Sequence, residues 1–229
     1  MPIIIPVITI DGTSSSGKGT VCNILSNELK WNFLDSGIIY RTLALAAIYK
    51  KINTKSENSL VSLIINLNVR FVFNKHIAKI FLDGKDITDK IRNENISILA
   101  SKIATFKKVR HALLFLQRSF RKLPGLIADG RDMGTVVFPD ASVKIFLDAS
   151  LQIRTKRRMK QLQKKGLYIN FEDLLKKIKE RDLRDHNREF NPLIAAKNSL
   201  ILDSSKMSIE EIIKVIKNYI KKKYNYYYI

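Results

Sequence analysis

The chain has 229 residues, of which 45% are hydrophobic, so it can form a packed core and is not an intrinsically disordered protein. Its 41 Lys and Arg residues outnumber its 21 Asp and Glu residues, which gives a formal net charge of +20. The single cysteine, Cys22, excludes an internal disulfide, and together with the three dispersed histidines it provides no zinc-ligand spacing.

The positive charge has two interpretations. Lysine is in excess together with isoleucine and asparagine along the whole chain, as genome composition can produce; the alternative is a surface that binds polyanions. The tyrosine-rich tail, Lys221–Ile229, is expected to fray, with stacking on RNA as its alternative. The N-terminal segment has no basic region and Pro6 interrupts it, so it is a poor signal peptide. No apolar run reaches the ~20 residues needed to span a bilayer, so we expect a soluble cytoplasmic protein without membrane contact.

Short apolar runs alternate with helical patterns, which predicts an α/β fold with a parallel sheet flanked by helices. The predicted strands are Val7–Ile10, Phe33–Leu34, Leu126–Ala128, Val143–Leu147 and Leu200–Leu202. The predicted helices are Lys18–Lys30, Ile38–Lys50, Lys107–Arg121, Leu151–Lys164, Phe171–Glu189 and Ile209–Lys222, the last preceded by a capping box at Ser208 and Glu211. An aspartate directly follows each strand, and ligands bind beyond the carboxyl ends of parallel strands. These aspartates therefore mark the edge where we expect the site.

Residues 63–92 have an antiparallel texture instead. Val69–Phe73 alternates, Asn74–His76 can turn, and Asp83-Gly84 is a strong hairpin dipeptide after the apolar run Ile77–Leu82. We expect a single unit in which residues 1–62 and 93–229 form the core and residues 63–92 form a small antiparallel β insert.

The segment Gly12–Thr20 reads Gly-Thr-Ser-Ser-Ser-Gly-Lys-Gly-Thr and fits the phosphate-loop pattern G-x-x-x-x-G-K between a strand and a helix. Small residues let backbone N–H groups surround an anion, and the helix N-terminus adds partial positive charge. Lys18 would stabilise the charge that shifts between the transferred and leaving phosphates. The alternative is a Ser/Gly-rich turn that caps a helix. The predicted ATP-binding residues are Gly12, Thr13, Ser14, Ser15, Ser16, Gly17, Lys18, Gly19 and Thr20.

The residue after Lys18 distinguishes subclasses of this motif. Gly19 stands where many phosphate-loop proteins have a Ser or Thr that contacts Mg²⁺. We therefore expect Mg²⁺ to be held through ATP and water, without a direct protein ligand. The chain lacks the Asn-Lys-x-Asp element that a GTPase uses for guanine, so a switch GTPase is not expected.

Two charged turns follow predicted strands. On their own, Ser36 and Arg41 favour a helix cap and a solvated charge; the alternative is that both face a ligand. Arg131 and Asp132 lie between glycines, where burial of such a pair is costly without a purpose. An arginine fork suits phosphate and Asp132 can accept from an exocyclic amine; the alternative is a structural ion network.

A charged stripe lies on the predicted helix Phe171–Glu189. Arg181, Asp185 and Arg188 are spaced i, i+4, i+7 and share one face that nearly continues the apolar side. This pattern favours a cleft lining over a salt-bridged solvent face. The preceding helix carries three arginines that would belong to a mobile lid, at about residues 155–168, or to a solvated face: Arg154, Arg157 and Arg158.

In this order the segments resemble the bacterial cytidylate kinases, type 1 nucleoside monophosphate kinases of the P-loop class, over essentially the full chain. The resemblance is carried by Ile8–Thr20, Leu34–Arg41, Leu123–Ala141 and Ile178–Arg188, and its most specific stretch is Gly-Arg-Asp-Met-Gly-Thr-Val-Val-Phe-Pro from Gly130. It implies a five-stranded parallel P-loop kinase sheet, with the β insert as part of the monophosphate-binding domain. It also implies transfer of the γ-phosphoryl group of ATP to CMP or dCMP, with Mg²⁺, by a monomer.

The resemblance assigns roles residue by residue. Ser36, Ser101, Arg110 and Asp132 match positions that recognise cytosine, Arg181 and Asp185 those around the sugar, and Arg41, Arg131 and Arg188 those around the CMP phosphate. It gives catalytic roles to Lys18, Arg131 and Arg157, the last with Arg154 and Arg158 on the lid side.

One departure from the pattern is Ser15, where many members have glycine, and slower turnover is the expected effect. Two rival functions remain open. The nearest is another small-acceptor P-loop kinase that uses UMP, AMP or shikimate. The other is a basic nucleic-acid-binding protein with a vestigial phosphate loop, and we do not expect nucleic-acid binding to be the function.

Overall fold

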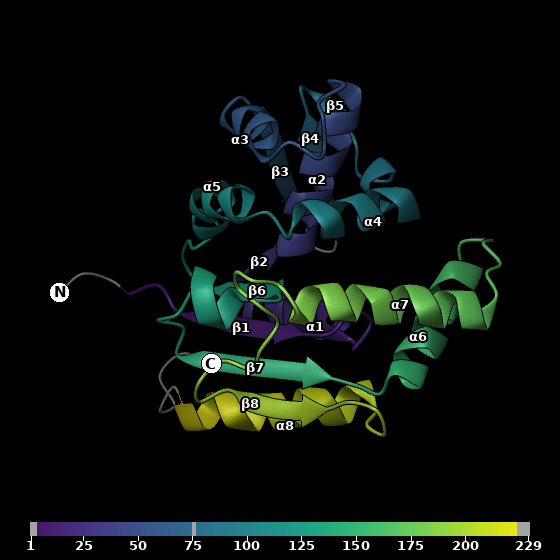
Figure 1. Ribbon diagram of the computed structural model, residues 1–229. Helices are drawn as coiled ribbons and strands as arrows, with labels where there is room; N and C mark the ends of the chain where they lie inside the picture. The colour runs from purple at the N-terminus through teal and green to yellow at the C-terminus, as the bar shows by residue number, and fades with distance from the viewer. Residues whose placement is uncertain (1–3, 75–76, 224–229) are drawn as a thin grey trace. The chain divides into compact units, whose positions relative to one another are not determined.

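The computed structural model describes residues 4–74 and 77–223 (Figure 1). None of the helices in these ranges combines the length and the apolar character needed to cross a bilayer. The chain divides into two compact units, one formed by Met1–Leu34 with Arg121–Ile229 and the other by Asp35–Phe120. The predicted insert, residues 63–92, lies in the middle of the second unit.

The first unit contains the predicted parallel sheet, and its five strands are confirmed. Their spatial order is β2 (Asn32–Asp35), β6 (Leu126–Gly130), β1 (Val7–Gly12), β7 (Val143–Asp148) and β8 (Leu200–Asp203). The central strand β1 is fully buried and pairs in parallel with both neighbours, with Ile8 opposite Ile127 and Val143. Burial on both faces explains why β1 reads as a continuous apolar run rather than an alternating one.

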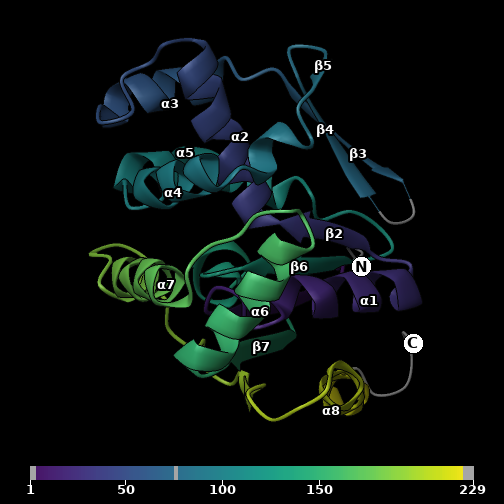
Figure 2. The same cartoon turned by 90° about the vertical axis from the view of Figure 1, so that its right-hand side faces the viewer.

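Two helices cover one face of this sheet. The apolar sides of α1 (Lys18–Leu29) and α8 (Ile209–Lys223) pack against β1, β6 and β7 in one core that contains Val21, Leu25 and Ile216 (Figures 1 and 2). The predicted capping box at the start of α8 is confirmed. The Ser208 N–H donates to Glu211 at 2.8 Å, and the Glu211 N–H donates to the Ser208 hydroxyl at 3.2 Å.

The helices α6 (Leu151–Gln163) and α7 (Phe171–His186) pack on each other through Leu162, Leu174 and Ile178. The predicted end of α7 at Glu189 was wrong. The Leu193 N–H donates to the Asp185 carbonyl at 2.9 Å, so that carbonyl is engaged by a residue beyond the helix. Arg188 consequently lies in the turn that follows α7, not on the helix face expected from the i, i+7 spacing.

The second unit contains the expected antiparallel sheet, β3 (Val69–Asn74), β4 (Ile77–Leu82) and β5 (Lys85–Asp86), in that order. Asp83 and Gly84 both have positive φ, 48° and 79°, which suits the tight hairpin between β4 and β5. The turn predicted at Asn74–His76 lies partly outside the described residues. Of the tail that was predicted to fray, residues 221–223 belong to the helix α8, and residues 224–229 lie outside the described residues.

The helices of the second unit are α2 (Ser36–Tyr49), α3 (Glu57–Ile65), α4 (Glu94–Ile103) and α5 (Lys107–Arg118), with a single 3₁₀ turn, η1 (Lys90–Arg92), before α4. Sequence patterns did not predict α3 and α4. Both begin at a side-chain cap: Ser56 accepts from the Ser59 N–H at 3.3 Å, and Asn93 accepts from the Asn95 N–H at 2.8 Å. The predicted end of α5 at Arg121 was three residues too late, because the helix ends at Arg118.

Candidate active site

The phosphate loop leaves β1 through a glycine that no other residue could replace without movement. Gly12 has φ 143°, and a Cβ on it would lie 1.9 Å from the Leu147 carbonyl oxygen. Gly17, with φ 103°, is the residue before α1 begins at Lys18. Thr13, Ser16 and Lys18 are buried, whereas Gly19 and Thr20 are exposed at the start of α1. The sequence thus folds into the strand–loop–helix arrangement that the motif requires.

Lys18 lies inside the loop that it was predicted to serve. Only 5% of the residue is exposed, and its ammonium donates to the Thr13 carbonyl and lies 3.4 Å from the Ser16 hydroxyl. Burial, and next the nearby Arg131, lower the pKa of Lys18 from 10.5 to about 8, while Asp129 acts in the opposite direction. A phosphate in the loop would favour the charged form, so anion binding and protonation of Lys18 are coupled.

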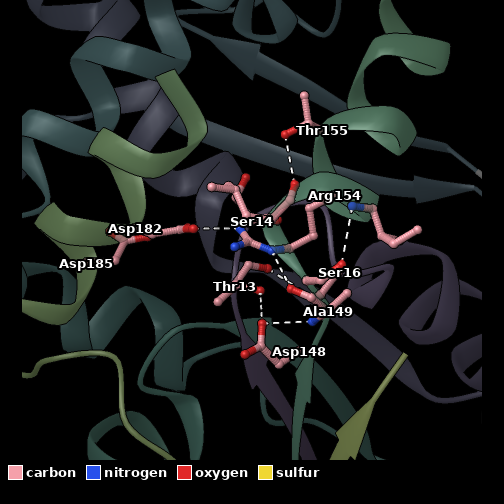
Figure 3. A network of polar contacts seen from close by, with 12 residues as sticks. Thr13, Ser14, Ser16, Asp148, Ala149, Arg154, Thr155, Asp182 and Asp185 are labelled. Carbon is pink, nitrogen blue, oxygen red and sulfur yellow. Dashed lines mark hydrogen bonds and ion pairs between the residues drawn. The ribbon is translucent and has the colours of Figure 1, made fainter. Parts of the chain in front are cut away.

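The loop is fixed to the end of β7 by Asp148 (Figure 3). The Thr13 hydroxyl donates to Asp148 Oδ1 at 2.5 Å, and the Ala149 N–H donates to the same oxygen at 2.8 Å. Asp148 is one of the aspartates that follow a predicted strand, and the structure shows what it does there: it holds the first turn of the loop.

A second attachment comes from Ser204, which follows β8, and from Arg157 on α6. The Ser16 carbonyl accepts from the Ser204 hydroxyl at 2.8 Å and from the Arg157 guanidinium at 3.0 Å. The same guanidinium donates to the Ser204 hydroxyl at 2.9 Å and to its carbonyl at 2.6 Å. In this structure the Arg157 guanidinium donates to the loop backbone and to Ser204, so its predicted contact with a transferred phosphate stays a prediction.

Arg154 is a buried arginine rather than an open lid residue, with 5% of its surface exposed. It donates to the Ala149 carbonyl at 2.8 Å and to the Ser14 carbonyl at 3.3 Å, and it forms an ion pair of 2.7 Å with Asp182 on α7 (Figure 3). Arg154 therefore connects the phosphate loop with α7. Arg158 donates to Gln161 Oε1 at 3.4 Å.

An arginine cluster surrounds Asp185 at the end of α7. Arg131, from the turn after β6, donates through Nε to Asp185 Oδ2 at 2.8 Å, and Arg188 donates to Oδ1. Asp185 is 1% exposed, and burial alone would raise its pKa, but Arg131, Arg188 and Arg181 together hold the pKa of that carboxyl well below its usual range. Four of the predicted site residues are thus brought together, with Asp132 buried next to Arg131 in sequence.

The remaining predicted residues belong to the second unit. Ser36 is buried at the start of α2, and Arg41 forms a 3.0 Å ion pair with Asp35, which also caps the helix by accepting from the Ile38 N–H at 3.2 Å. Asp35 is therefore the cap that was assigned to Ser36. The other two, Ser101 on α4 and Arg110 on α5, are also buried.

Arg110 is held by aromatic and backbone partners. Its guanidinium lies 5.8 Å from the ring centroid of Tyr40 and donates to the Ala104 carbonyl at 3.0 Å. The Ser101 hydroxyl is buried and has no hydrogen-bond partner within the described part of the chain. Burying a hydroxyl without a hydrogen-bond partner is costly. The cost is explained if the Ser101 hydroxyl forms its hydrogen bond with a ligand.

The phosphate loop has one carboxylate beside it that could face a metal ion bound mainly by phosphate oxygens. Within residues 4–74 and 77–223, no group of three or more His, Cys, Asp or Glu side chains could enclose a metal ion. Asp129 does place a carboxylate beside the loop: its Oδ2 lies 3.6 Å from the point where a Cβ on Gly19 would be. One carboxylate next to a polyphosphate is a common arrangement for Mg²⁺.

Sequence patterns missed three residues that hold the site together. Asp148 and Ser204 form hydrogen bonds with the phosphate loop, and Asp182 forms an ion pair with Arg154. The only available signal for Asp148 was its place directly after a strand. Ser204 and Asp182 had no signal, because Ser16 lies 188 residues from Ser204 along the chain and Arg154 lies 28 residues from Asp182.

The central strand of the parallel sheet leads into a phosphate loop that contains Lys18, and an arginine cluster lies in the same unit. These features define a P-loop kinase. Comparison with known proteins gives the family. The family model described as cytidylate kinase matches residues 8–222, so the chain belongs to the cytidylate kinase family, as its motifs indicated.

Individual relatives agree over almost the whole length. The chain is 56% identical to the cytidylate kinase of Proteus mirabilis (strain HI4320) over 222 residues, which cover 97% of this chain and 99% of that protein. It is 57% identical to the cytidylate kinase of Photorhabdus laumondii subsp. laumondii over 222 residues, or 97% and 98% of the two chains. It is 54% identical to the cytidylate kinase of Escherichia coli O9:H4 (strain HS) over 223 residues, again 97% and 98%.

Proposed function

We propose that this protein is an ATP-dependent kinase that transfers the γ-phosphoryl group of ATP to CMP and dCMP, giving ADP and CDP or dCDP. Full-length similarity to curated cytidylate kinases supports the reaction class and the acceptor. The observation that carries the mechanism is the pairing, within one unit, of the Lys18 loop with the Arg131–Asp185–Arg188 cluster.

The loop would bind the phosphates of ATP. The backbone N–H groups of a loop at a helix N-terminus favour an anion, and Lys18 supplies a full charge within the loop. In this structure the Lys18 ammonium donates to the Thr13 carbonyl and lies 3.4 Å from the Ser16 hydroxyl. ATP binding would replace these internal contacts by phosphate oxygens, which are stronger acceptors.

Mg²⁺ would enter with ATP and be held chiefly by phosphate oxygens and water, with the Asp129 carboxylate beside them. When bound, the ion neutralises part of the charge that the two phosphorylated substrates bring together. Every other role falls to the protein's own side chains.

The acceptor phosphate would meet the arginines. In this structure Asp185 engages Arg131 and Arg188, and an incoming dianionic phosphate would compete for the same guanidinium donors. The acceptor is already an anion, so the reaction requires no strong general base. In the second unit, Arg41 is proposed for the CMP phosphate on the strength of the family resemblance. Ser36, Ser101 and Arg110 are proposed for cytosine on the strength of the resemblance and of their burial.

The decisive experiment is a coupled ADP-release assay with Mg-ATP and one acceptor at a time: CMP, dCMP, UMP or AMP. Turnover with CMP and dCMP but little with UMP and none with AMP is expected. Equal turnover with UMP would keep the kinase and reject the cytosine assignment of Asp132 and Arg110. No turnover with any acceptor would reject the kinase, and RNA binding with steep salt dependence would then support the nucleic-acid alternative.

The matched variants are Lys18→Met and Lys30→Met. Both remove one lysine charge from the ends of α1, but only Lys18 lies in the phosphate loop. Turnover should be lost in the first and retained in the second. We further propose a monomer in the cytoplasm, a compartment that fits a chain with a single cysteine, Cys22.

A further inference from the structure

Asp11 is a buried carboxylate to which no role has yet been given. It is in β1, directly before Gly12 of the phosphate loop, and 3% of the residue is exposed. Its two oxygens are both used by the turn that follows β6: Oδ1 accepts from the Met133 N–H and Oδ2 accepts from the Gly134 N–H, each at 2.8 Å. Asp11 thus joins the strand that starts the ATP loop to the turn that carries Arg131 and Asp132.

The peptide between Asp132 and Met133 is hydrogen-bonded at both its N–H and its carbonyl group. Its N–H group, on Met133, donates to Asp11, and its carbonyl, on Asp132, accepts from the N–H groups of Val136 and Val137 at 2.9 and 3.1 Å. Asp132 has φ −144° and ψ 25°, outside the regular helix and strand regions. Because both ends of the peptide are bonded, the backbone at Asp132 is held in place, and with it the direction of the Asp132 Cα–Cβ bond.

The approach of the turn to β1 is close enough to exclude a side chain at Gly134. A Cβ there would lie 2.8 Å from the Thr9 hydroxyl and 3.4 Å from Asp11 Oδ2. The Thr9 hydroxyl itself is buried and has no hydrogen-bond partner in the described chain. The turn is therefore attached to β1 through Asp11 and not through Thr9.

The chemistry of Asp11 is unusual for a structural link. No ion pair involving Asp11 occurs among the described residues, so backbone donors are its direct partners, and the charge of Lys18 offsets the cost of burial only in part. Only a carboxylate offers two acceptors at this spacing; an asparagine would direct an N–H₂ group at one of the two N–H donors. The cost of burying this group has an explanation if the direction of Asp132 matters for substrate binding.

We propose that Asp11 is a positioning residue for CMP, which orients Asp132 and Arg131 through the backbone N–H groups of Met133 and Gly134. This inference rests on the proposed function, because Arg131 and Asp132 must contact CMP for their orientation to affect its binding. Asp11 does not touch the substrates. Its loss should weaken CMP far more than ATP, although it precedes the ATP loop in sequence.

The test compares Asp11→Asn with Thr9→Val, two near-isosteric changes in the same strand next to the same turn. Asp11→Asn should raise the KM for CMP about 10- to 100-fold, the factor expected for loss of a hydrogen bond to a charged group, and leave the KM for ATP within about twofold. Thr9→Val should change neither, because its hydroxyl has no partner to lose.

A thermal melting curve shows whether each variant is folded at the assay temperature. This separates the positioning role from simple destabilisation, since a folded variant with a purely structural defect would keep both KM values. Asp11→Asn with an unchanged KM for CMP would overturn the inference. If that variant does not fold, Asp11→Glu keeps the charge but moves the carboxylate relative to the two N–H donors, and an unchanged KM for CMP would again refute the inference.

The wild-type protein supplies a further test. Amide hydrogen exchange at Met133 and Gly134 should be slow, and fast exchange at both would contradict the proposed link. The two hypotheses can fail separately. If the wild type does not phosphorylate CMP, the proposed function fails. If the wild type is active but the Asp11 variants bind CMP normally, only the positioning role fails.

Discussion

Ser15 provides the sharpest prediction, because it places a side chain in the phosphate loop where the backbone favours glycine. Its φ is 62°, in the left-handed region. A non-glycine residue there costs about 1–2 kcal/mol, whereas glycine costs about 0.5–1 kcal/mol more in unfolded-chain entropy. Ser15→Gly should therefore stabilise the fold by about 0.5–1 kcal/mol, or about 1–4 °C in Tm for a chain of this size.

The kinetic consequence depends on where that strain acts. If the strain at Ser15 resists adjustment of the loop around the transferred phosphate, Ser15→Gly lowers the activation free energy by up to about 0.5–1 kcal/mol. The kcat then rises about two- to fivefold. The assay is ADP release at saturating Mg-ATP and CMP, together with thermal melting of both proteins.

Lys30→Gly is the matched control, because Lys30 has φ 56° at the end of α1, away from the loop. It should raise Tm by a similar amount and leave kcat unchanged. A Ser15→Gly protein that gains stability but turns over at the wild-type rate would refute the idea that loop strain limits catalysis. An equal rise of kcat in both variants would assign the effect to general stability.

Three other changes have defined outcomes. Lys18→Met should reduce kcat by about 10²–10³-fold in the ADP-release assay, as for loss of one oriented transition-state donor, with little change in Tm. Ser204→Ala removes the hydroxyl that links Ser16 to the Arg157 guanidinium and should lower the free energy of unfolding by about 1–3 kcal/mol and raise the KM for ATP; an unaltered KM would show that the loop does not need this support. Burial raises the pKa of Asp11 from 3.8 to about 7, so the proton that the folded state retains stabilises it fully below pH about 4, and this stabilisation is lost as pH rises through about 7. Relative to Asp11→Asn, the wild-type free energy of unfolding should therefore fall by about 4 kcal/mol between pH 4 and 8 in urea titrations, and parallel pH profiles would contradict this.

The elements that the sequence predicted correctly are those with strong local patterns. The five strands of the parallel sheet are continuous apolar runs, and the phosphate loop has fixed spacing and glycines at positions that demand them. The helices α3 and α4 were missed because they are short, at nine and ten residues, and the caps Ser56 and Asn93 lie in polar segments that also resemble loops.

The orientation of the arginines could not be predicted from spacing. Arg154 and Arg157 are one turn apart on α6, which fixes their shared helix face but not which backbone carbonyls surround that face. Arg188 was expected on the α7 face and lies in the following turn, because a carbonyl near the helix end is taken by Leu193. Contacts of this kind depend on residues far along the chain, and local periodicity contains no information about them.

The attachments of the phosphate loop limit how far this motif can be treated as a transferable module. Thr13 is held by a residue 135 positions away and Ser16 by one 188 positions away, each from a different strand end. Grafting Gly12–Thr20 onto another strand–helix junction would transfer its glycines and its lysine but neither of those two anchors. A graft should therefore bind ATP weakly until residues equivalent to Asp148 and Ser204 are also introduced, which makes the binding site a property of the whole sheet edge.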